Sequence, residues 1–291
     1  MGEFFSVACA AVWAFAVILL RRSGETLPAF ELNLVKNLLG LALMVPTVLL
    51  TEGFSLPGYT AGELSLVLVS GIVGIAVADT WYLRALNLMG AGRTGVVASL
   101  YSPFVIVLSM LFLGESLRAW QLAGFGLVLA GILLVTWRTN RRDVSARALR
   151  TGVAFGAGAV LMMAVGVVMV KPVLEGDDFF WTVLLRLAGG AAAMLIFVWA
   201  TRGASMMMAH YRRPQPWPMI LVAGFLATYL SMMLWLAGYR LTSASVAAVL
   251  NETAAAFIVL FAWWLLGEGM SRRRIAGVAL TFSGVVVILS V

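Results

Sequence analysis

The chain has 291 residues, of which 62% are hydrophobic and only 11% are charged. Soluble domains contain roughly 45–50% apolar and about 25% charged residues, so this composition excludes a soluble globular protein. The net charge of +7 comes from basic residues in short polar segments rather than from a continuous basic and aromatic stripe, which argues against nucleic-acid binding.

Ten apolar runs follow one another along the chain, separated by charged residues or by glycine and proline. Each is close to the roughly 20 residues that a helix needs to cross the hydrocarbon core. They are too long and too continuously apolar for the strands of a membrane barrel. We therefore predict an all-α membrane protein of ten transmembrane helices. The predicted spans are residues 3–20, 29–50, 64–86, 94–113, 119–137, 152–173, 179–200, 217–239, 244–266 and 274–290.

The two halves of the chain repeat each other. Sliding the sequence along itself until the Leu-Gly-Glu motif of 113–115 falls on that of 266–268 also places Gly124 on Gly277, without a gap. We call this displacement the repeat shift. Each half has five spans, an odd number, so two covalently joined copies cross the membrane in opposite directions. We therefore predict two inverted five-helix repeats. The predicted boundaries are a first repeat at 1–137, a basic loop at 138–151 and a second repeat at 152–291.

An inverted repeat of this kind indicates a transporter. In such proteins the substrate binds near the midplane between the repeats, and rocking of one half against the other alternates access. This inference rests on architecture and not on the chemistry of a site.

The repeated motifs resemble those of the drug/metabolite transporter superfamily, EamA type. Trp13 in the first span and the glycines Gly131 and Gly284 contribute to the resemblance, which covers essentially the whole chain. The resemblance implies ten spans and a carrier for an amino acid, an amine, a drug or another small metabolite. Segments 85–93 and 250–253 look like those of bacterial exporters of this type, which implies an efflux protein of the bacterial inner (plasma) membrane.

The halves differ where the first has Pro103 and the second has Ala256. A proline removes one helical hydrogen bond and kinks a helix. We therefore expect the fourth and ninth spans to bend differently. Glu115 and Glu268, which follow glycine at the ends of these spans, are expected to anchor loops.

Basic residues divide unequally between the two sides of the membrane. Fourteen Lys and Arg residues fall on the side of the central loop, and Arg118, Lys171 and Arg240 fall on the other. The positive-inside rule therefore predicts a cytoplasmic central loop and external termini. The superfamily resemblance implies cytoplasmic termini, so the two arguments disagree.

Ionisable residues within the spans are candidates for function, because a charge at mid-membrane is costly unless it is paired or hydrated. Asp79 and Glu252 are the proton-coupling candidates. The alternative for Asp79 is a salt bridge to Lys36 or Arg84, and the alternative for Glu252 is a structural hydrogen bond. Near the front of each half a slightly smaller shift than the repeat shift aligns Lys36 with Arg186. Each of these two either neutralises an acid or caps a broken helix, or else anchors a substrate carboxylate or phosphate.

The predicted substrate site adds asparagines and aromatic side chains, whose ring faces suit cationic or aromatic ligands. The acids are not duplicated, since Asp79 corresponds to Met232 and Glu252 to Ser99, so the predicted site is asymmetric. The predicted substrate-binding residues are Trp13, Asn33, Lys36, Asn37, Asp79, Tyr82, Tyr101, Arg186, Tyr229, Trp235, Asn251 and Glu252.

The sequence predicts no catalytic residue, cofactor or metal site, because it carries no phosphate-binding loop, metal-ligand cluster or nucleophile triad that can be placed together. The leading hypothesis is a secondary transporter that works by alternating access, with a small-molecule substrate, the lipid bilayer and protons as its partners. A membrane-embedded enzyme acting on a lipid-linked substrate is one alternative. A non-transporting receptor or assembly factor is the other.

Overall fold

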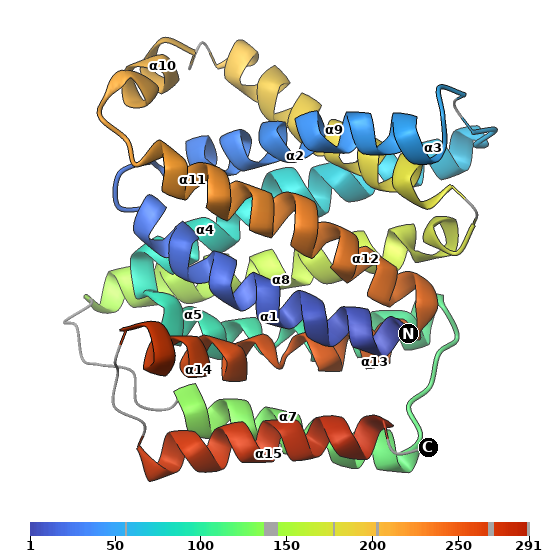
Figure 1. Ribbon diagram of the computed structural model, residues 1–291, viewed down its shortest axis with the longest axis vertical. Coiled ribbons are helices and arrows are strands. Elements are labelled where there is room, and N and C mark those ends of the chain that lie inside the picture. The colour runs from blue at the N-terminus through green and yellow to red at the C-terminus, as the bar shows by residue number, and fades with distance from the viewer. Residues whose placement is uncertain (56, 137–144, 177, 202–203, 267–270, 290–291) are drawn as a thin grey trace.

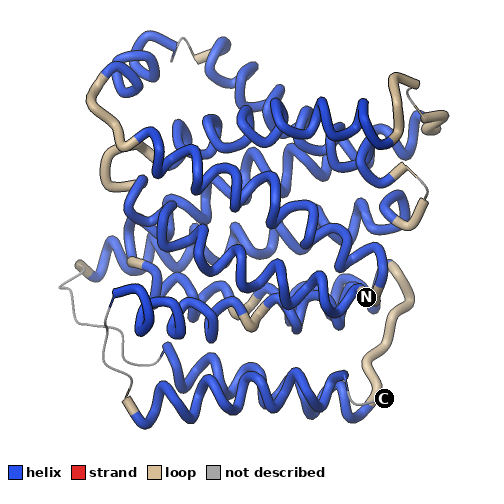
Figure 2. The backbone as a smooth tube through the Cα atoms, viewed as in Figure 1, coloured by secondary structure: helices blue, strands red, loops and turns tan. Residues whose placement is uncertain are grey.

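The computed structural model describes residues 1–55, 57–136, 145–176, 178–201, 204–266 and 271–289. Within these ranges every regular element is a helix (Figure 2). Elements η1 and η2 are π-helical. The elements are α1 (Gly2–Ser23), α2 (Ala29–Thr51), α3 (Ala61–Gly71), η1 (Ile72–Val77), α4 (Ala78–Met89), α5 (Ala91–Ala98), α6 (Tyr101–Phe112), α7 (Ala119–Thr136), α8 (Ala146–Leu174), α9 (Phe179–Ala200), α10 (Ala204–Arg212), α11 (Trp217–Gly224), η2 (Phe225–Leu230), α12 (Ser231–Leu241), α13 (Ala244–Asn251), α14 (Ala254–Leu266) and α15 (Arg272–Leu289).

The described helices form eight stretches that are long and apolar enough to cross a membrane, and two shorter apolar helices. The all-helical membrane class predicted from composition is therefore confirmed. The two shorter helices, Ala119–Leu134 and Ile275–Leu289, coincide with the fifth and tenth predicted spans. The crossing of the bilayer by all ten stretches stays a prediction.

Helix boundaries recur in the two halves with the shift found in the sequence. The π-helical segments begin at Ile72 and Phe225, two positions that the repeat shift superposes. The same shift carries Ala119, the first residue of α7, onto Arg272, the first residue of α15. The repeat thus relates the π-helical segments of the two halves as well as their α-helices.

The fourth and ninth predicted spans are both interrupted, at Ser99–Leu100 and at Glu252–Thr253. The two interruptions match under the repeat shift. The expectation that the proline makes the two spans bend differently stays a prediction. In each interruption a hydroxyl group bonds the backbone one turn earlier: Ser99 Oγ donates to Val96 O, and Thr253 Oγ1 donates to Leu250 O. Such bonds compete with helix continuation and do not require proline.

Matching helices of the two halves run in opposite directions. In Figure 1, α1 starts beside the N label, whereas α8 starts at the opposite end of the molecule and runs back. Similarly, α7 runs away from the end that carries both termini, and α15 returns to it.

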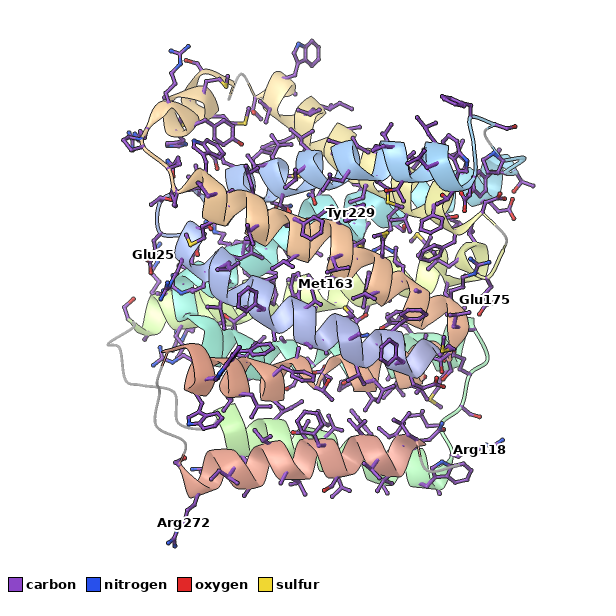
Figure 3. All side chains as sticks on the ribbon, in the orientation of Figure 1. Glu25, Arg118, Met163, Glu175, Tyr229 and Arg272 are labelled. Carbon is purple, nitrogen blue, oxygen red and sulfur yellow. The ribbon has the colours of Figure 1, made fainter. Side chains whose placement is uncertain are left out.

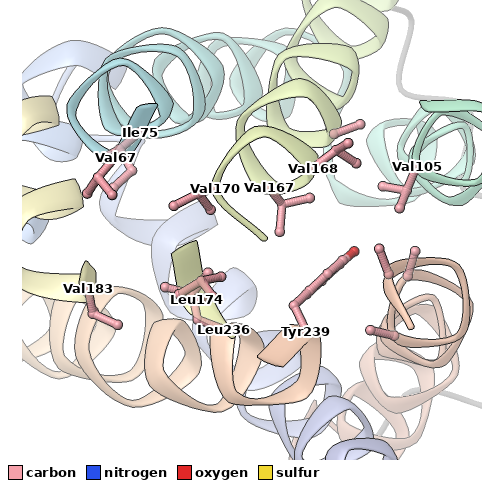
Figure 4. Close-up of a cluster of buried hydrophobic side chains, with 14 of the residues drawn as sticks. Val67, Ile75, Val105, Val167, Val168, Val170, Leu174, Val183, Leu236 and Tyr239 are labelled. Atoms are coloured by element: carbon pink, nitrogen blue, oxygen red, sulfur yellow. The ribbon is translucent and has the colours of Figure 1, made fainter. Parts of the chain in front are cut away.

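The two halves interlock. Helix α1 of the first half packs mainly against α11, α12, α13 and α14 of the second, and α8 of the second half packs against α4 and α6 of the first. Figure 4 shows one buried cluster at this boundary, in which Ile75 of η1 and Val105 of α6, from the first half, share a core with Val167 of α8 from the second. The space between the halves is therefore walled by helices from both.

Helices α7 and α15 pack chiefly against each other at one edge of the bundle (Figure 1). A Cβ atom on Gly131 of α7 would lie 2.3 Å from Thr281 Oγ1 and 2.7 Å from Gly277 O of α15. A Cβ atom on Gly284 would lie 2.6 Å from Gly124 O. The repeated glycines therefore allow the close backbone approach that stabilises helix pairs in lipid.

We predict that Gly131→Ala destabilises the protein by about 1–3 kcal/mol, because its methyl group would overlap α15. Gly126→Ala on the same helix is the matched control, since a Cβ atom there has no neighbour within 4 Å. Thermal unfolding in detergent measures both. Equal unfolding temperatures for the two variants would contradict the role of close approach.

Candidate functional site

A cavity of about 170 Å³ lies between the two halves. One water molecule occupies about 30 Å³ of liquid, so this space holds several waters or one small solute. Its walls come from α1, η1, α4, α5 and α6 of the first half, and from α8, α9, η2, α12, α13 and α14 of the second. Met163, which is labelled near the middle of the molecule in Figure 3, lies in its wall.

The structure brings eight of the twelve predicted substrate-binding residues to this cavity. The other four do not line it: Lys36 contacts the wall residue Asp79, Asn33 contacts Ile75 and Thr80 next to the wall, Asn37 contacts Asn33 and Lys36, and Tyr229 lies elsewhere. The predicted residues in the wall are Trp13, Asp79, Tyr82, Tyr101, Arg186, Trp235, Asn251 and Glu252. Cys9 and Ser231 also line the cavity. Sequence reasoning missed them, because small residues in apolar helices carry no local signal that separates a cavity wall from ordinary packing.

Lys36 and Asp79 form a buried ion pair. Lys36 Nζ lies 2.5 Å from Asp79 Oδ2, and the lysine is only 2% exposed. The ammonium also donates to Asn37 Oδ1 at 3.2 Å and to Thr228 Oγ1 of η2 at 3.4 Å. Of the two salt bridges considered for Asp79, the structure shows the one with Lys36, while the Arg84 guanidinium lies 4.4 Å from the centre of the Phe155 ring.

Two asparagines of α2 connect this pair to the first π-helical segment. Asn33 Nδ2 donates to Ile75 O in η1 and to Thr80 Oγ1, both at 2.9 Å. Asn37 Nδ2 donates to Asn33 Oδ1 at 3.0 Å, which places the two amides on the shared helix face expected from their spacing. They hold α2 against η1 and do not line the cavity.

Arg186 is 1% exposed and is far less well satisfied than Lys36. Its Nη1 donates to Gly166 O at 3.4 Å, longer than an ordinary hydrogen bond, and its guanidinium lies 5.3 Å from the Trp235 ring centre. Its buried Nε has no hydrogen-bond partner. Within the part of the chain that the structure describes, no carboxylate pairs with this side chain.

Glu252 stands at the interruption between α13 and α14, where its carboxyl group reaches the cavity. Ser102 donates to Glu252 Oε1 from its backbone N at 3.2 Å and from Oγ at 3.0 Å. Among the described residues, the second oxygen, Oε2, receives no hydrogen bond. The carboxyl group is thus oriented by one neighbour and keeps one oxygen available.

Four aromatic residues also line the cavity, namely Trp13, Tyr82, Tyr101 and Trp235. Trp13 and Tyr82 have ring centres 6.0 Å apart, and the hydroxyl of Tyr101 is hydrogen-bonded to that of Tyr239. Tyr229, which is labelled in Figure 3, instead shares a hydrogen bond with Thr47 Oγ1 at 2.7 Å. The site therefore combines fixed aromatic faces with two acids and one arginine.

A polar cluster lies at the end of the molecule that carries both termini. Lys171 Nζ donates to Glu175 Oε1 at 2.7 Å, to Tyr239 O at 2.8 Å and to Thr242 O at 3.0 Å. Glu115 Oε1 lies 3.9 Å from the same nitrogen. We call this set of five residues the Lys171 cluster.

Glu115 also caps α13. Its Oε1 accepts a hydrogen bond from Ala244 N at 2.8 Å, and its Oε2 accepts one from Ser245 N at 3.1 Å. A carboxylate at a helix N-terminus satisfies free N–H groups and the helix dipole. The anchoring role expected for Glu115 is confirmed, and Glu268 lies outside the described residues.

Metal ligation receives no support in the described ranges, where no three His, Cys, Asp or Glu residues gather closely enough to hold an ion. The side chains that line the cavity offer charge pairing, hydrogen bonding and aromatic contact.

Comparisons with known proteins place these features in a family. The sequence profile of the EamA-like transporter family matches residues 1–137 and 150–290. The uncharacterized transporter YvbV of Bacillus subtilis (strain 168) is 26% identical over 149 residues, which cover 50% of this chain and 48% of that protein. An uncharacterized transporter of Clostridium kluyveri is 22% identical over 142 residues, covering 49% of this chain and 45% of that protein. The chain thus matches about half the length of these curated relatives.

A solved crystal structure has the same fold over nearly the whole chain. The two superpose with a TM-score of 0.77 at 18% sequence identity, covering 99% of this chain and 98% of the other. At this level of identity the likeness concerns the fold alone.

We predict that Lys36→Met and Asp79→Asn each lower the free energy of unfolding by up to about 3–5 kcal/mol, because each leaves the other charge buried and unpaired. The double variant removes both charges and is expected to lose less than the sum of the two. Thermal or denaturant unfolding in detergent measures all three. Additive losses would show that the two side chains do not act as a pair.

Proposed function

Because this chain belongs to the EamA-like transporter family, we propose that it is a secondary transporter that carries a small solute across the bacterial plasma membrane by alternating access. The observation that carries the proposal is the cavity between the halves, into which Asp79, Arg186 and Glu252 project from apolar helices. Ionisable groups at such depth are costly and mark substrate or ion pathways. Membership of a transporter family favours carriage over the alternative of a lipid-modifying enzyme.

The proposed architecture is ten spans in two inverted five-helix repeats, with the repeat boundaries at 1–137 and 152–291. The repeat shift that relates the helix boundaries supports this arrangement, as do the opposite directions of α1 and α8. The proposed orientation has the basic end in the cytoplasm. Figure 3 shows Arg272 at that end and Arg118 at the other.

The two ends of the bundle differ in a way that suits alternating access. The smaller shift that aligns Lys36 with Arg186 also aligns Arg21 with Lys171 and Glu25 with Glu175. Lys171 makes the short bonds of the Lys171 cluster, whereas the ion pair between Arg21 and Glu25 is longer, at 3.8 Å. We propose that the Lys171 cluster seals the end with the termini in this conformation, and that the matching contacts tighten at the other end when the halves rock.

Carriage is tested by reconstitution. Thermal-shift screening of the purified protein against amino acids, polyamines, nucleosides and organic cations identifies a ligand, and exchange of that labelled ligand is then measured in proteoliposomes. Exchange across the bilayer supports the proposal. A ligand that binds but does not exchange contradicts it.

In the same assay we predict that Glu252→Gln abolishes the pH dependence of flux, because the amide cannot carry a proton. Asp79→Asn is expected to have the same effect if Asp79 shares the coupling. Ser102→Ala, which removes the hydroxyl bond to Glu252 but leaves its carboxyl group, is the control and should retain pH dependence. Unchanged pH dependence in both acid variants would reject proton coupling through these residues.

The seal is tested with Cys9, the single cysteine of the chain, which lies in the cavity wall. We predict that Lys171→Met raises the rate at which a membrane-impermeant maleimide, added on the side of the termini, labels Cys9. Arg21→Met at the opposite end is the matched control and should leave that rate unchanged. The same rate in Lys171→Met and the unmodified chain would argue against a seal at this end.

A further inference from the structure

Each half places one basic residue at the same point of the fold. The backbone of Lys36 lies against Gly224, and the backbone of Arg186 lies against Gly71. The two glycines match under the repeat shift, and each directly precedes a π-helical segment. The two basic side chains are thus equivalent in position, and differences in their partners arise from the residues around them.

The residue that pairs with the basic group differs between the halves. Lys36 is paired with Asp79, whereas the position that matches Asp79 in the second half is Met232. Both Asp79 and Met232 line the cavity. The second half therefore keeps the cation of the pair, Arg186, and replaces its acid with a thioether that cannot neutralise it.

An unpaired guanidinium is costly in this setting. Arginine has five N–H donors, and the structure shows one long hydrogen bond from Arg186, to Gly166 O. A Cβ atom on Gly74 would lie 2.6 Å from Arg186 Nη2, so glycine at this position of η1 leaves room for the guanidinium beside the cavity. The side chain is buried, has unused donors and faces an internal space.

The other charges around the cavity determine which ligand fits. Asp79 acts on the Arg186 guanidinium from a distance, but it is already paired with Lys36. Glu252 is bound to Ser102 and keeps one oxygen available. A simple amine would add positive charge beside an unpaired arginine. A doubly charged phosphate would meet one guanidinium and two acids.

We propose that Arg186 binds a carboxylate group of the transported solute, an assignment of substrate class that rests on the proposed transport function. A carboxylate accepts two parallel N–H bonds from one guanidinium and matches its single charge. The remainder of the solute is apolar or aromatic, because Trp13, Tyr82 and Trp235 form much of the wall. An amino group on the same solute would meet Glu252.

The test uses three probes of nearly the same shape and different charge: phenylpropionate, phenylpropionamide and phenylpropylamine. Binding to the purified full chain is measured by calorimetry and by protection of Cys9 from maleimide. Phenylpropionate should bind at least about tenfold more tightly than the amide or the amine, which is the range of a charge-assisted hydrogen bond. Equal binding of the three probes, preference for the amine, or no measurable binding of phenylpropionate overturns the assignment.

Variants test whether the preference for phenylpropionate depends on Arg186 and on the residue at position 232. Arg186→Gln should remove the advantage of phenylpropionate over its amide, and Arg186→Lys should keep part of it. Met232→Asp restores an acid at the position that matches Asp79 and should weaken phenylpropionate binding about tenfold or more. Met232→Asn, of the same shape without charge, is the matched control and should not. Equal binding by the Asp and Asn variants, each shown to be folded by its unfolding temperature, overturns the role given to position 232.

Flux in proteoliposomes separates this inference from the transport proposal. Phenylpropionate that binds through Arg186 but does not cross supports the carboxylate site and contradicts transport. Phenylpropylamine that crosses while phenylpropionate does not contradicts the carboxylate site and leaves transport in place.

Discussion

A charged group inside a hydrocarbon layer must meet an opposite charge, hydrogen-bond partners or water, and this constraint organises the interior of the protein. Lys36 meets it with Asp79, Asn37 and Thr228. Lys171 meets it near the bundle end with two acids and two backbone carbonyl oxygens. Arg186 has the fewest partners of these three basic residues, and among the three only Arg186 lines the cavity.

The duplicated scaffold and the unduplicated polar residues have different physical roles. Glycines at matching positions allow close helix approach in both halves, and the π-helical segments and interruptions recur at the same register. These features depend on backbone geometry, which tolerates little change. Side chains at the cavity wall, such as Asp79 and Met232, can differ between the halves without displacing a helix backbone, because they border the cavity. The asymmetry of the site therefore leaves the helix packing alike in the two halves, while Arg186 lacks the acid that pairs Lys36.

The sequence predicts the helices well because long apolar runs are set by the thickness of the bilayer and not by tertiary contacts. Eight of its twelve predicted substrate-binding residues line the cavity, since a buried charge such as Arg186 or Glu252 stands out in an apolar helix. It does not predict that Lys171, treated as one of the charges on the external side, is buried and multiply bonded. Nor does it separate Tyr229, which bonds Thr47, from Tyr101, which lines the cavity. Those outcomes depend on which face of each helix points into the bundle. An apolar sequence indicates this face only weakly, because lipid and the protein interior accept the same residues.

The interlocking of the two halves bears on how the chain is assembled during synthesis. Helix α1 is made long before its main packing partners, α11, α12, α13 and α14, which lie in the last third of the chain. Chains emerge from the ribosome with the N-terminal part first, and domains generally fold as units. The first half therefore does not form a finished unit when it leaves the ribosome, and α1 lacks most of its native neighbours until the second half is inserted beside it.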